Sequence, residues 1–320
     1  MHLPGGVLDN LTCAVTTAAA TGAIGYSGYR LRREATALTA PKMAACGTLV
    51  FAAQMVNFPV DQGVSGHLIG GLLAAALLGP WAGLLAVAMV LSLQSLLAAD
   101  GGVVTLGANI INMGVVTVWG GYWMLQQSRR LFAVDTAVGR SASASLAAAV
   151  SVVAAATVCA LQLSLSGAGS AAVALAEVVP VHLRIGLAEA IVSGALVALA
   201  AVAIPGMLYG GELRDVAASG RSRLGRGPAV VLALALALTL FVAPWASAEP
   251  DGLEAALASL IPGQVAPPVV IAPLADYQVP GVTHAAFSTA LAGALGALAV
   301  YVAVWTAGRA LRLRPVAARR

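Results

Sequence analysis

The residues best suited to bind a metal ion are the first two of the chain, Met1 and His2. A free α-amine, the next backbone amide nitrogen and an imidazole at position 2 can form fused chelate rings around one ion. If the amide loses its proton, the three nitrogens lie nearly in a plane. A fourth nitrogen would then complete a square-planar site, a geometry that favours Ni(II) or Cu(II). A chain can also begin Met-His by chance, so the dipeptide alone does not establish a site.

Other polar residues in apolar surroundings could complete such a site or orient its ligands. His67, preceded by Ser65, is expected at the end of an apolar helix, where it is either a ligand or an interfacial anchor. His182 is expected to begin a later span. Glu189 follows within that span, and its carboxylate either has a functional role or pairs with Arg184 or a neighbouring helix.

Two asparagines and a late histidine are weaker candidates. Asn109 and Asn112 are three residues apart on one helix face, so they could join helices or orient a ligand imidazole. His284 could pass metal inward, but we favour a solitary interfacial histidine.

The composition restricts the class of protein. Charged residues make up 9% of the 320, against roughly 25% in an average soluble domain. Hydrophobic residues make up 60%. So few charges exclude a soluble enzyme, a nucleic-acid binder and a secreted disulfide scaffold. Cys13, Cys46 and Cys159 have no metal-binding or disulfide spacing. The sequence therefore predicts a multi-pass protein embedded in a lipid bilayer.

Apolar runs predict an all-α transmembrane helical bundle of about nine helices. The expected spans are 11–28, 43–57, 67–79, 81–98, 106–126, 143–166, 182–204, 228–246 and 285–307. Gly79-Pro80 separates the third span from the fourth, because proline ends a helix at the residue before it.

The positive charges predict the orientation. With nine spans, four groups of Lys and Arg fall on one side, which the positive-inside rule assigns to the cytoplasm. The N-terminus is then outside and the C-terminus inside. The first ten residues lack the positive region of a signal peptide, so we expect Met1 on the mature protein. All four histidines and most carboxylates are expected at the outer surface. For the carboxylates, the positive-inside rule is enough to explain this position. The four groups comprise Arg30, Arg32, Arg33 and Lys42; Arg129, Arg130 and Arg140; Arg214, Arg221, Arg223 and Arg226; and Arg309, Arg312, Arg314, Arg319 and Arg320.

Several motifs resemble the CbiM/NikM family, the cobalt/nickel substrate-binding membrane component of energy-coupling-factor transporters. Coverage is about residues 1–205, and the block from Phe58 to Gly114 is the most specific part. One departure is Gly5-Gly6, where similar sequences often have Asp before the glycine. The motifs are Met1-His2-Leu3-Pro4, Phe58-Pro59-Val60, the segment 63–71, Leu78-Gly79-Pro80-Trp81-Ala82, the segment 94–102, Leu106-Gly107-Ala108-Asn109, Asn112-Met113-Gly114, and His182 with Gly186 and Glu189.

A second resemblance covers the C-terminal part. Pro250-Asp251-Gly252-Leu253-Glu254 is similar to the PDGLE motif of a small accessory component (NikN-like) found beside or fused to nickel transporters. The resemblances divide the chain into a seven-helix metal-binding core (1–205), a cytoplasmic linker (206–227) and a two-helix accessory module (228–320) with an extracytoplasmic loop.

The resemblance implies a metal site made by the Met1 amine, the His2 amide and imidazole, and the His67 imidazole. It implies a capture subunit for Ni(II) or Co(II) in a prokaryotic plasma membrane, working with a transmembrane coupling protein and two ATP-binding-cassette ATPases. The chain contains no Walker A sequence, so ATP hydrolysis is expected on separate subunits. No cofactor other than the transported ion and no nucleic-acid partner are expected. Square-planar nitrogen ligation and the PDGLE-like module favour nickel over cobalt.

Two alternatives remain open at this stage. The chain could be a metal channel or secondary transporter that works alone. It could also be a membrane-embedded hydrolase using Ser65 with His67, or Glu189, but residues two apart on a helix do not face each other.

Overall fold

The computed structural model describes residues 1–132, 136–210, 226–263 and 269–312, and helices dominate these ranges. Most of the predicted linker 206–227, with Arg214, Arg221 and Arg223, lies outside them, as do residues 313–320. The elements are α1 (Asn10–Glu34), α2 (Thr39–Gln54), β1 (Phe58–Asp61), β2 (Val64–Gly66), α3 (Gly71–Leu97), α4 (Leu106–Ile110), the π-helix η1 (Ile111–Gly120), α5 (Gly121–Ser128), α6 (Ala137–Leu165), α7 (Ala171–Ala203), η2 (Pro205–Met207), α9 (Arg226–Ala237), η3 (Leu238–Val242), η4 (Ala243–Trp245), α10 (Gly252–Leu260), η5 (Ala275–Tyr277) and α11 (Ala285–Arg312).

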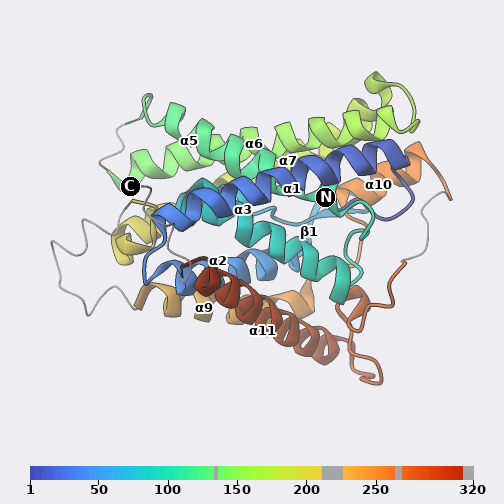
Figure 1. The fold of residues 1–320 in the computed structure, drawn as a ribbon. Helices are drawn as coiled ribbons and strands as arrows, with labels where there is room; N and C mark the ends of the chain where they lie inside the picture. The colour runs from blue at the N-terminus through green and yellow to red at the C-terminus, as the bar shows by residue number, and fades with distance from the viewer. Residues whose placement is uncertain (133–135, 211–225, 264–268, 313–320) are drawn as a thin grey trace.

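The long helices run side by side in a bundle (Figure 1). Helices α6 and α7 pack against each other along one side, and α2, α9 and α11 form the other. Helices α1 and α3 lie between these groups. The predicted all-α bundle is confirmed, with one addition, a short β-hairpin.

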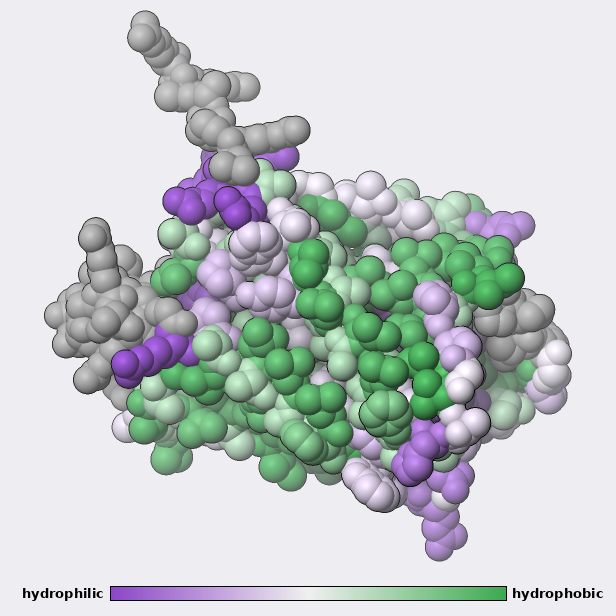
Figure 2. All heavy atoms as spheres, turned by 90° about the horizontal axis from the view of Figure 1, so that it is seen from below, coloured by the Kyte–Doolittle hydropathy of each residue, from purple (hydrophilic) through white to green (hydrophobic). Residues whose placement is uncertain are grey.

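Length and apolar composition suit this bundle to a membrane. Among the described residues, five helical stretches are long and apolar enough to cross a bilayer: Gly71–Leu97, Ala137–Leu165, Ala171–Ala203, Arg226–Trp245 and Ala285–Arg312. Four of them are continuous over at least the roughly 20 residues that a span needs, whereas Gly71–Leu97 is interrupted at Gly79. Figure 2 shows hydrophobic residues over most of one face, with strongly hydrophilic residues toward its two ends. This arrangement confirms a transmembrane helical bundle; which end faces outward stays a prediction.

Helix α3 contains the predicted break. Gly79 has φ 79° and ψ 176°, which is not helical, and Pro80 follows it. Gly71 and Gly83 lie against adjacent residues of η1. A Cβ added at Gly71 would meet Thr117, and a Cβ added at Gly83 would meet Val118. A straight helix would separate those two glycines by about 18 Å, at 1.5 Å per residue. The chain therefore reverses at Gly79, as the separate spans 67–79 and 81–98 predicted.

Two predicted positions are wrong. Helix α7 begins at Ala171 with Ser170 as its N-cap and continues through Pro180, so His182 lies inside the helix and does not begin it. Proline is tolerated in membrane helices when neighbouring groups satisfy the backbone. His67 does not lie on a helix, because α3 starts at Gly71. Ser65 belongs to β2, which pairs antiparallel with β1.

We predict that Gly79→Ala destabilises the protein. The positive φ strains any residue with a side chain, at a cost of about 1–3 kcal/mol. The new Cβ would also lie 2.4 Å from the Tyr209 ring, so this ring would have to move. Thermal unfolding in detergent should therefore show a lower midpoint.

The matched control is Gly120→Ala, which places a Cβ in open space at a helical residue. It should leave the midpoint unchanged or raise it. Equal behaviour of the two variants would contradict the assigned role of Gly79.

Candidate metal centre

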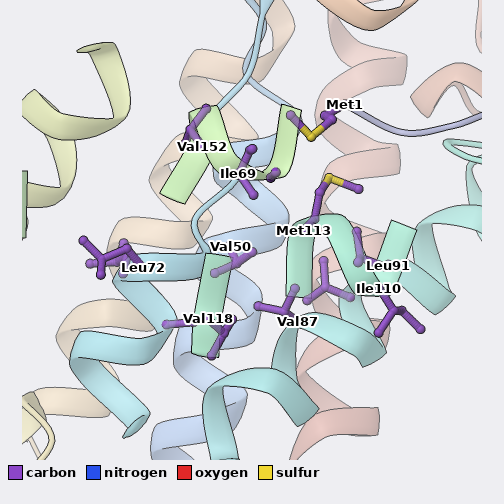
Figure 3. Close-up of a cluster of buried hydrophobic side chains, with 14 of the residues drawn as sticks. Met1, Val50, Ile69, Leu72, Val87, Leu91, Ile110, Met113, Val118 and Val152 are labelled. Carbon is purple, nitrogen blue, oxygen red and sulfur yellow. The ribbon is translucent and has the colours of Figure 1, made fainter. Parts of the chain in front are cut away.

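The first residues of the chain are held inside the bundle by hydrogen bonds to Leu3. Its N–H donates to Asn109 Oδ1 (2.8 Å), and its carbonyl accepts from Thr105 Oγ1 (2.6 Å), Asn109 Nδ2 (3.1 Å) and the Gly102 N–H (2.9 Å). The Met1 side chain joins the buried hydrophobic cluster that includes Ile69 and Met113 (Figure 3). Asn109 therefore fixes the backbone two residues from the amine.

This anchoring places the Met1 nitrogen beside two side chains. The nitrogen lies 2.7 Å from His67 Nε2 and 2.9 Å from Asp251 Oδ2. His67 Nδ1 lies 3.1 Å from the Leu68 carbonyl, which accepts the ring's N–H. The Nε2 lone pair then faces the Met1 nitrogen, as a metal-binding imidazole requires. Residues 66 positions apart thus meet as the sequence led us to expect.

His2 lies against His67 but not in a chelating orientation. The two rings stack with centroids 5.1 Å apart and an interplanar angle of 29°. His2 Nδ1 lies 3.0 Å from Asp100 Oδ1, while its buried Nε2 has no partner among the described residues. Within the described chain, no backbone carbonyl accepts a hydrogen bond from the His2 amide. In a chelate that includes the His2 amide nitrogen, the imidazole binds the ion through Nδ1. The imidazole must therefore turn away from Asp100 to bind an ion.

The C-terminal part of the chain also reaches His2 through Asp100. The Tyr277 hydroxyl donates to Asp100 Oδ2 (2.6 Å) and accepts from Gln94 Nε2 (3.0 Å). Burial, together with the Asp100 charge, raises the pKa of Tyr277 well above its ordinary value. The hydroxyl therefore keeps its proton and can donate continuously to Asp100.

Burial and neighbouring charges determine the protonation of His2 and Asp251 at this site. Burial lowers the pKa of His2 to about 4, outweighing the opposite influence of Asp100. The His2–Asp100 contact is therefore a hydrogen bond from a neutral imidazole and not an ion pair. Burial alone would raise the pKa of Asp251, but the Met1 ammonium holds it well below its ordinary value. Asp251 is thus an ionised carboxylate in the interior.

Glu189 and Ser65 hold the segment that carries His67. Glu189 accepts from the backbone N–H groups of Ile69 (2.6 Å) and Gly70 (2.7 Å). The alternative pairing with Arg184 is wrong, because that guanidinium contacts Asp61. The Ser65 hydroxyl donates to the Glu249 carbonyl (2.7 Å), which joins the hairpin to the C-terminal module.

Three other candidates do not join this cluster. His182 Nδ1 lies 2.7 Å from its own helix's Val178 carbonyl, and its Nε2 is buried without a partner among the described residues. Asn112 forms a reciprocal amide pair with Gln162 and does not orient a histidine. His284 is exposed just before α11, where its Nδ1 accepts from the Phe287 N–H, as a helix cap does.

A cavity of about 350 Å³ adjoins the cluster, between the N-terminal segment and the C-terminal module. Within the part of the chain that is described, no group of three or more His, Cys, Asp or Glu side chains is placed to hold an ion. Any site here therefore needs backbone nitrogens as well as side chains. The cavity is lined by His2 and His67 and by five carboxylate residues: Asp100, Glu249, Asp251, Glu254 and Asp276.

Sequence reasoning missed the roles of Asp251, Asp100 and Thr105. The positive-inside rule already accounted for outer carboxylates, so charge and position alone did not mark the two aspartates as different. Asp251 stands inside the PDGLE-like motif, which is the one sequence signal that could have singled it out.

Fold and site together describe a membrane-embedded helical bundle in which the first backbone nitrogen meets a buried histidine. Comparison with known families agrees. Residues 2–207 match the family described as the cobalt uptake substrate-specific transmembrane region, and residues 227–313 match the PDGLE domain. The chain belongs to the first of these families, with a PDGLE domain after it.

Individual relatives share parts of the chain. It is 45% identical over 131 residues to the putative fused nickel transport protein NikMN of Archaeoglobus fulgidus, covering 41% of this chain and 43% of that one. It is 39% identical over 116 residues to the fused nickel transport protein NikMN of Rhodobacter capsulatus (36% and 33%). It is 36% identical over 133 residues to the cobalt transport protein CbiM of Sorangium cellulosum (41% and 59%). The match thus spans less than two thirds of each relative.

A solved structure has the same fold over a large part of the chain. It is a truncated transition metal transporter, 30% identical, with a TM-score of 0.56, and the match covers 62% of this chain and 97% of that one.

We predict that Asn109→Ala loosens the N-terminal segment. The change removes one acceptor and one donor that hold Leu3, and a buried backbone group left without its partner costs about 1–3 kcal/mol. Hydrogen exchange should accelerate at the amides of His2, Leu3, Gly5 and Gly6. Asn10→Ala, at an exposed position at the start of α1, is the control and should leave that exchange unchanged. Equal exchange in the two variants would show that Asn109 does not hold the segment.

Proposed function

We propose that this chain is the substrate-capture subunit of a transition-metal importer and binds Ni(II), or Co(II), at the Met1–His2–His67 cluster. The observation that supports the proposal is the 2.7 Å contact between the Met1 nitrogen and His67 Nε2 inside the bundle. Burying a charged terminus is costly, so folding alone gives no reason for this contact between the two groups. They are, however, suitable ligands for these ions.

Binding then proceeds by local changes at the chain's start. The Met1 ammonium and the His2 amide each lose a proton when they bind the ion, since ligands bind deprotonated. The His2 ring turns Nδ1 from Asp100 toward the ion, completing two fused rings, and His67 Nε2 occupies the fourth position. Four nitrogens in a plane favour Ni(II). The fused nickel transport proteins among the relatives point the same way.

The arrangement of subunits that we propose is the one implied by the resemblance to the CbiM/NikM family. The core 1–205 captures the ion at the extracytoplasmic mouth of a prokaryotic plasma membrane, and the PDGLE-type module 228–320 assists there. A transmembrane coupling protein and two separate ATPases release the ion inside. The cobalt uptake family to which the chain belongs supports this organisation.

The hydrolase alternative lacks an activated nucleophile. Ser65 lies on a strand and its hydroxyl donates to the carbonyls of Glu249 and Pro250, so it is turned to the backbone and has no base to activate it among the described residues. Glu189 is likewise occupied by two backbone N–H groups. The relatives are named as transport proteins, which supports a transporter over an enzyme.

A residue added before Met1 should abolish metal binding. The extension converts the Met1 amine into an amide and forces extra atoms into a buried position, where Met1 is 2% exposed. Isothermal titration of the purified full chain with Ni(II) measures the effect, and we expect a loss of affinity of about 100-fold or more, since an amide in place of the amine removes one ligand outright.

An extension of the same length after Arg320 is the control and should bind as the parent chain does. His67→Ala should show a comparable loss while unfolding at a similar temperature. Full affinity in the N-terminally extended chain would exclude the amine as a ligand.

A channel or secondary transporter that works alone would take up Ni(II) without any ATPase. In vesicles that contain only this chain, we expect binding of Ni(II) but little sustained uptake. Adding the coupling protein, the ATPases and ATP should produce uptake. Sustained uptake by the chain alone would support a channel or secondary transporter instead.

A further inference from the structure

We propose that Asp251, from the PDGLE motif of the C-terminal module, is a working part of the metal centre. Its carboxylate positions the Met1 nitrogen against His67 and balances the charge of the bound ion. This inference rests on the function proposed above and assigns a role to one residue outside the core.

The contacts of Asp251 divide between its two oxygens. Oδ2 lies 2.9 Å from the Met1 nitrogen and 3.5 Å from His67 Nε2. Oδ1 accepts from the N–H groups of Leu253 (2.7 Å) and Glu254 (2.8 Å), so it caps helix α10. Capping alone would use only Oδ1. The second oxygen is therefore available to the proposed ligands.

The position of Asp251 is fixed by its surroundings. Glu254 Oε2 accepts from the Asp251 N–H (2.8 Å), completing a capping box. The Pro250 carbonyl accepts from the Ser65 N–H (2.9 Å). A Cβ on Gly252 would lie 2.4 Å from Val181 Cγ1, so only glycine permits this close approach to α7. The motif thus docks rigidly on the core and delivers one carboxylate to a residue 250 positions away.

The Asp251 carboxylate balances a positive charge both without and with the ion. Without metal, the carboxylate interacts with a single positive charge on Met1. In the loaded site the ion carries two positive charges and the deprotonated His2 amide one negative charge, so one net positive charge again faces the carboxylate. A deprotonated amine still has N–H groups, so it can continue to donate to Oδ2. Asp251 therefore balances the charge in both states, and its contribution to binding is to hold the Met1 nitrogen beside His67.

Neighbouring carboxylates do not share this position. Glu249 lines the same cavity but its side chain is exposed, whereas Asp251 is 8% exposed. Asp100 engages His2 and must release it when the ion binds. Of the five cavity carboxylates, only Asp251 forms an ion-pair contact with Met1 or His67 among the described residues.

The test compares Ni(II) affinity of the full chain in detergent for Asp251→Asn and Asp251→Ser. Asn and Ser are both good N-caps, so helix α10 keeps its cap while the charge is lost. We expect affinity to fall about 10–100-fold, the range found when groups that orient metal ligands are removed. Glu249→Gln removes one exposed charge from the same loop and should bind as the parent does.

Two further measurements separate a metal role from a structural one. The unfolding temperature without metal should fall in the Asn variant, because the buried Met1 ammonium loses its ionised partner although the cap is kept, so affinities are compared at a temperature where both chains are folded. Asp251→Glu, which keeps the charge, should bind Ni(II) more tightly than Asp251→Asn. Unchanged or increased affinity in both the Asn and Ser variants would overturn the inference, as would equal losses in Asp251→Glu and Asp251→Asn. A parent chain that binds no Ni(II) would instead refute the proposed function itself.

Discussion

The structure depends on one contact, between the backbone nitrogen that begins the chain and an imidazole that follows a β-hairpin. A charged terminus is normally solvated, and placing one inside a membrane bundle is costly unless it is paired and hydrogen-bonded. Here His67 and Asp251 provide the partners. The hydrogen bonds to Leu3 keep the terminus in place, and Glu189 keeps His67 in place. These interactions come from separate helices and a loop, so the site exists only when the bundle is assembled.

The two parts of the chain are joined at this same contact. Asp251 reaches the Met1 nitrogen directly, and Tyr277 reaches His2 through Asp100. Each of the first two residues therefore has one carboxylate partner that depends on the C-terminal module. The two carboxylates differ in what loading requires, since His2 must leave Asp100 while Met1 can stay with Asp251. This difference gives the module a physical way to influence when and how tightly an ion binds.

Residue types and local patterns predicted the ligand candidates and the bundle. Met-His at the start and His67 were chosen from chelate chemistry and family motifs, and the break at Gly79-Pro80 followed from proline's missing N–H. The features that were predicted wrongly or missed depend on tertiary structure. The strand around Ser65 is stabilised by carbonyls of the distant Glu249 and Pro250. Helix α7 starts early because Ser170 caps it, and Pro180 lies inside the helix without ending it. Asp251 has no local pattern that points to residue 1.

A structure of the Ni(II)-loaded full chain tests the proposed metal centre most directly. We predict one ion bonded to the Met1 nitrogen, the His2 amide nitrogen, His2 Nδ1 and His67 Nε2, with the His2 ring turned away from Asp100. An ion bound elsewhere, with the Met1 nitrogen still paired only to Asp251 and His67, would contradict this prediction.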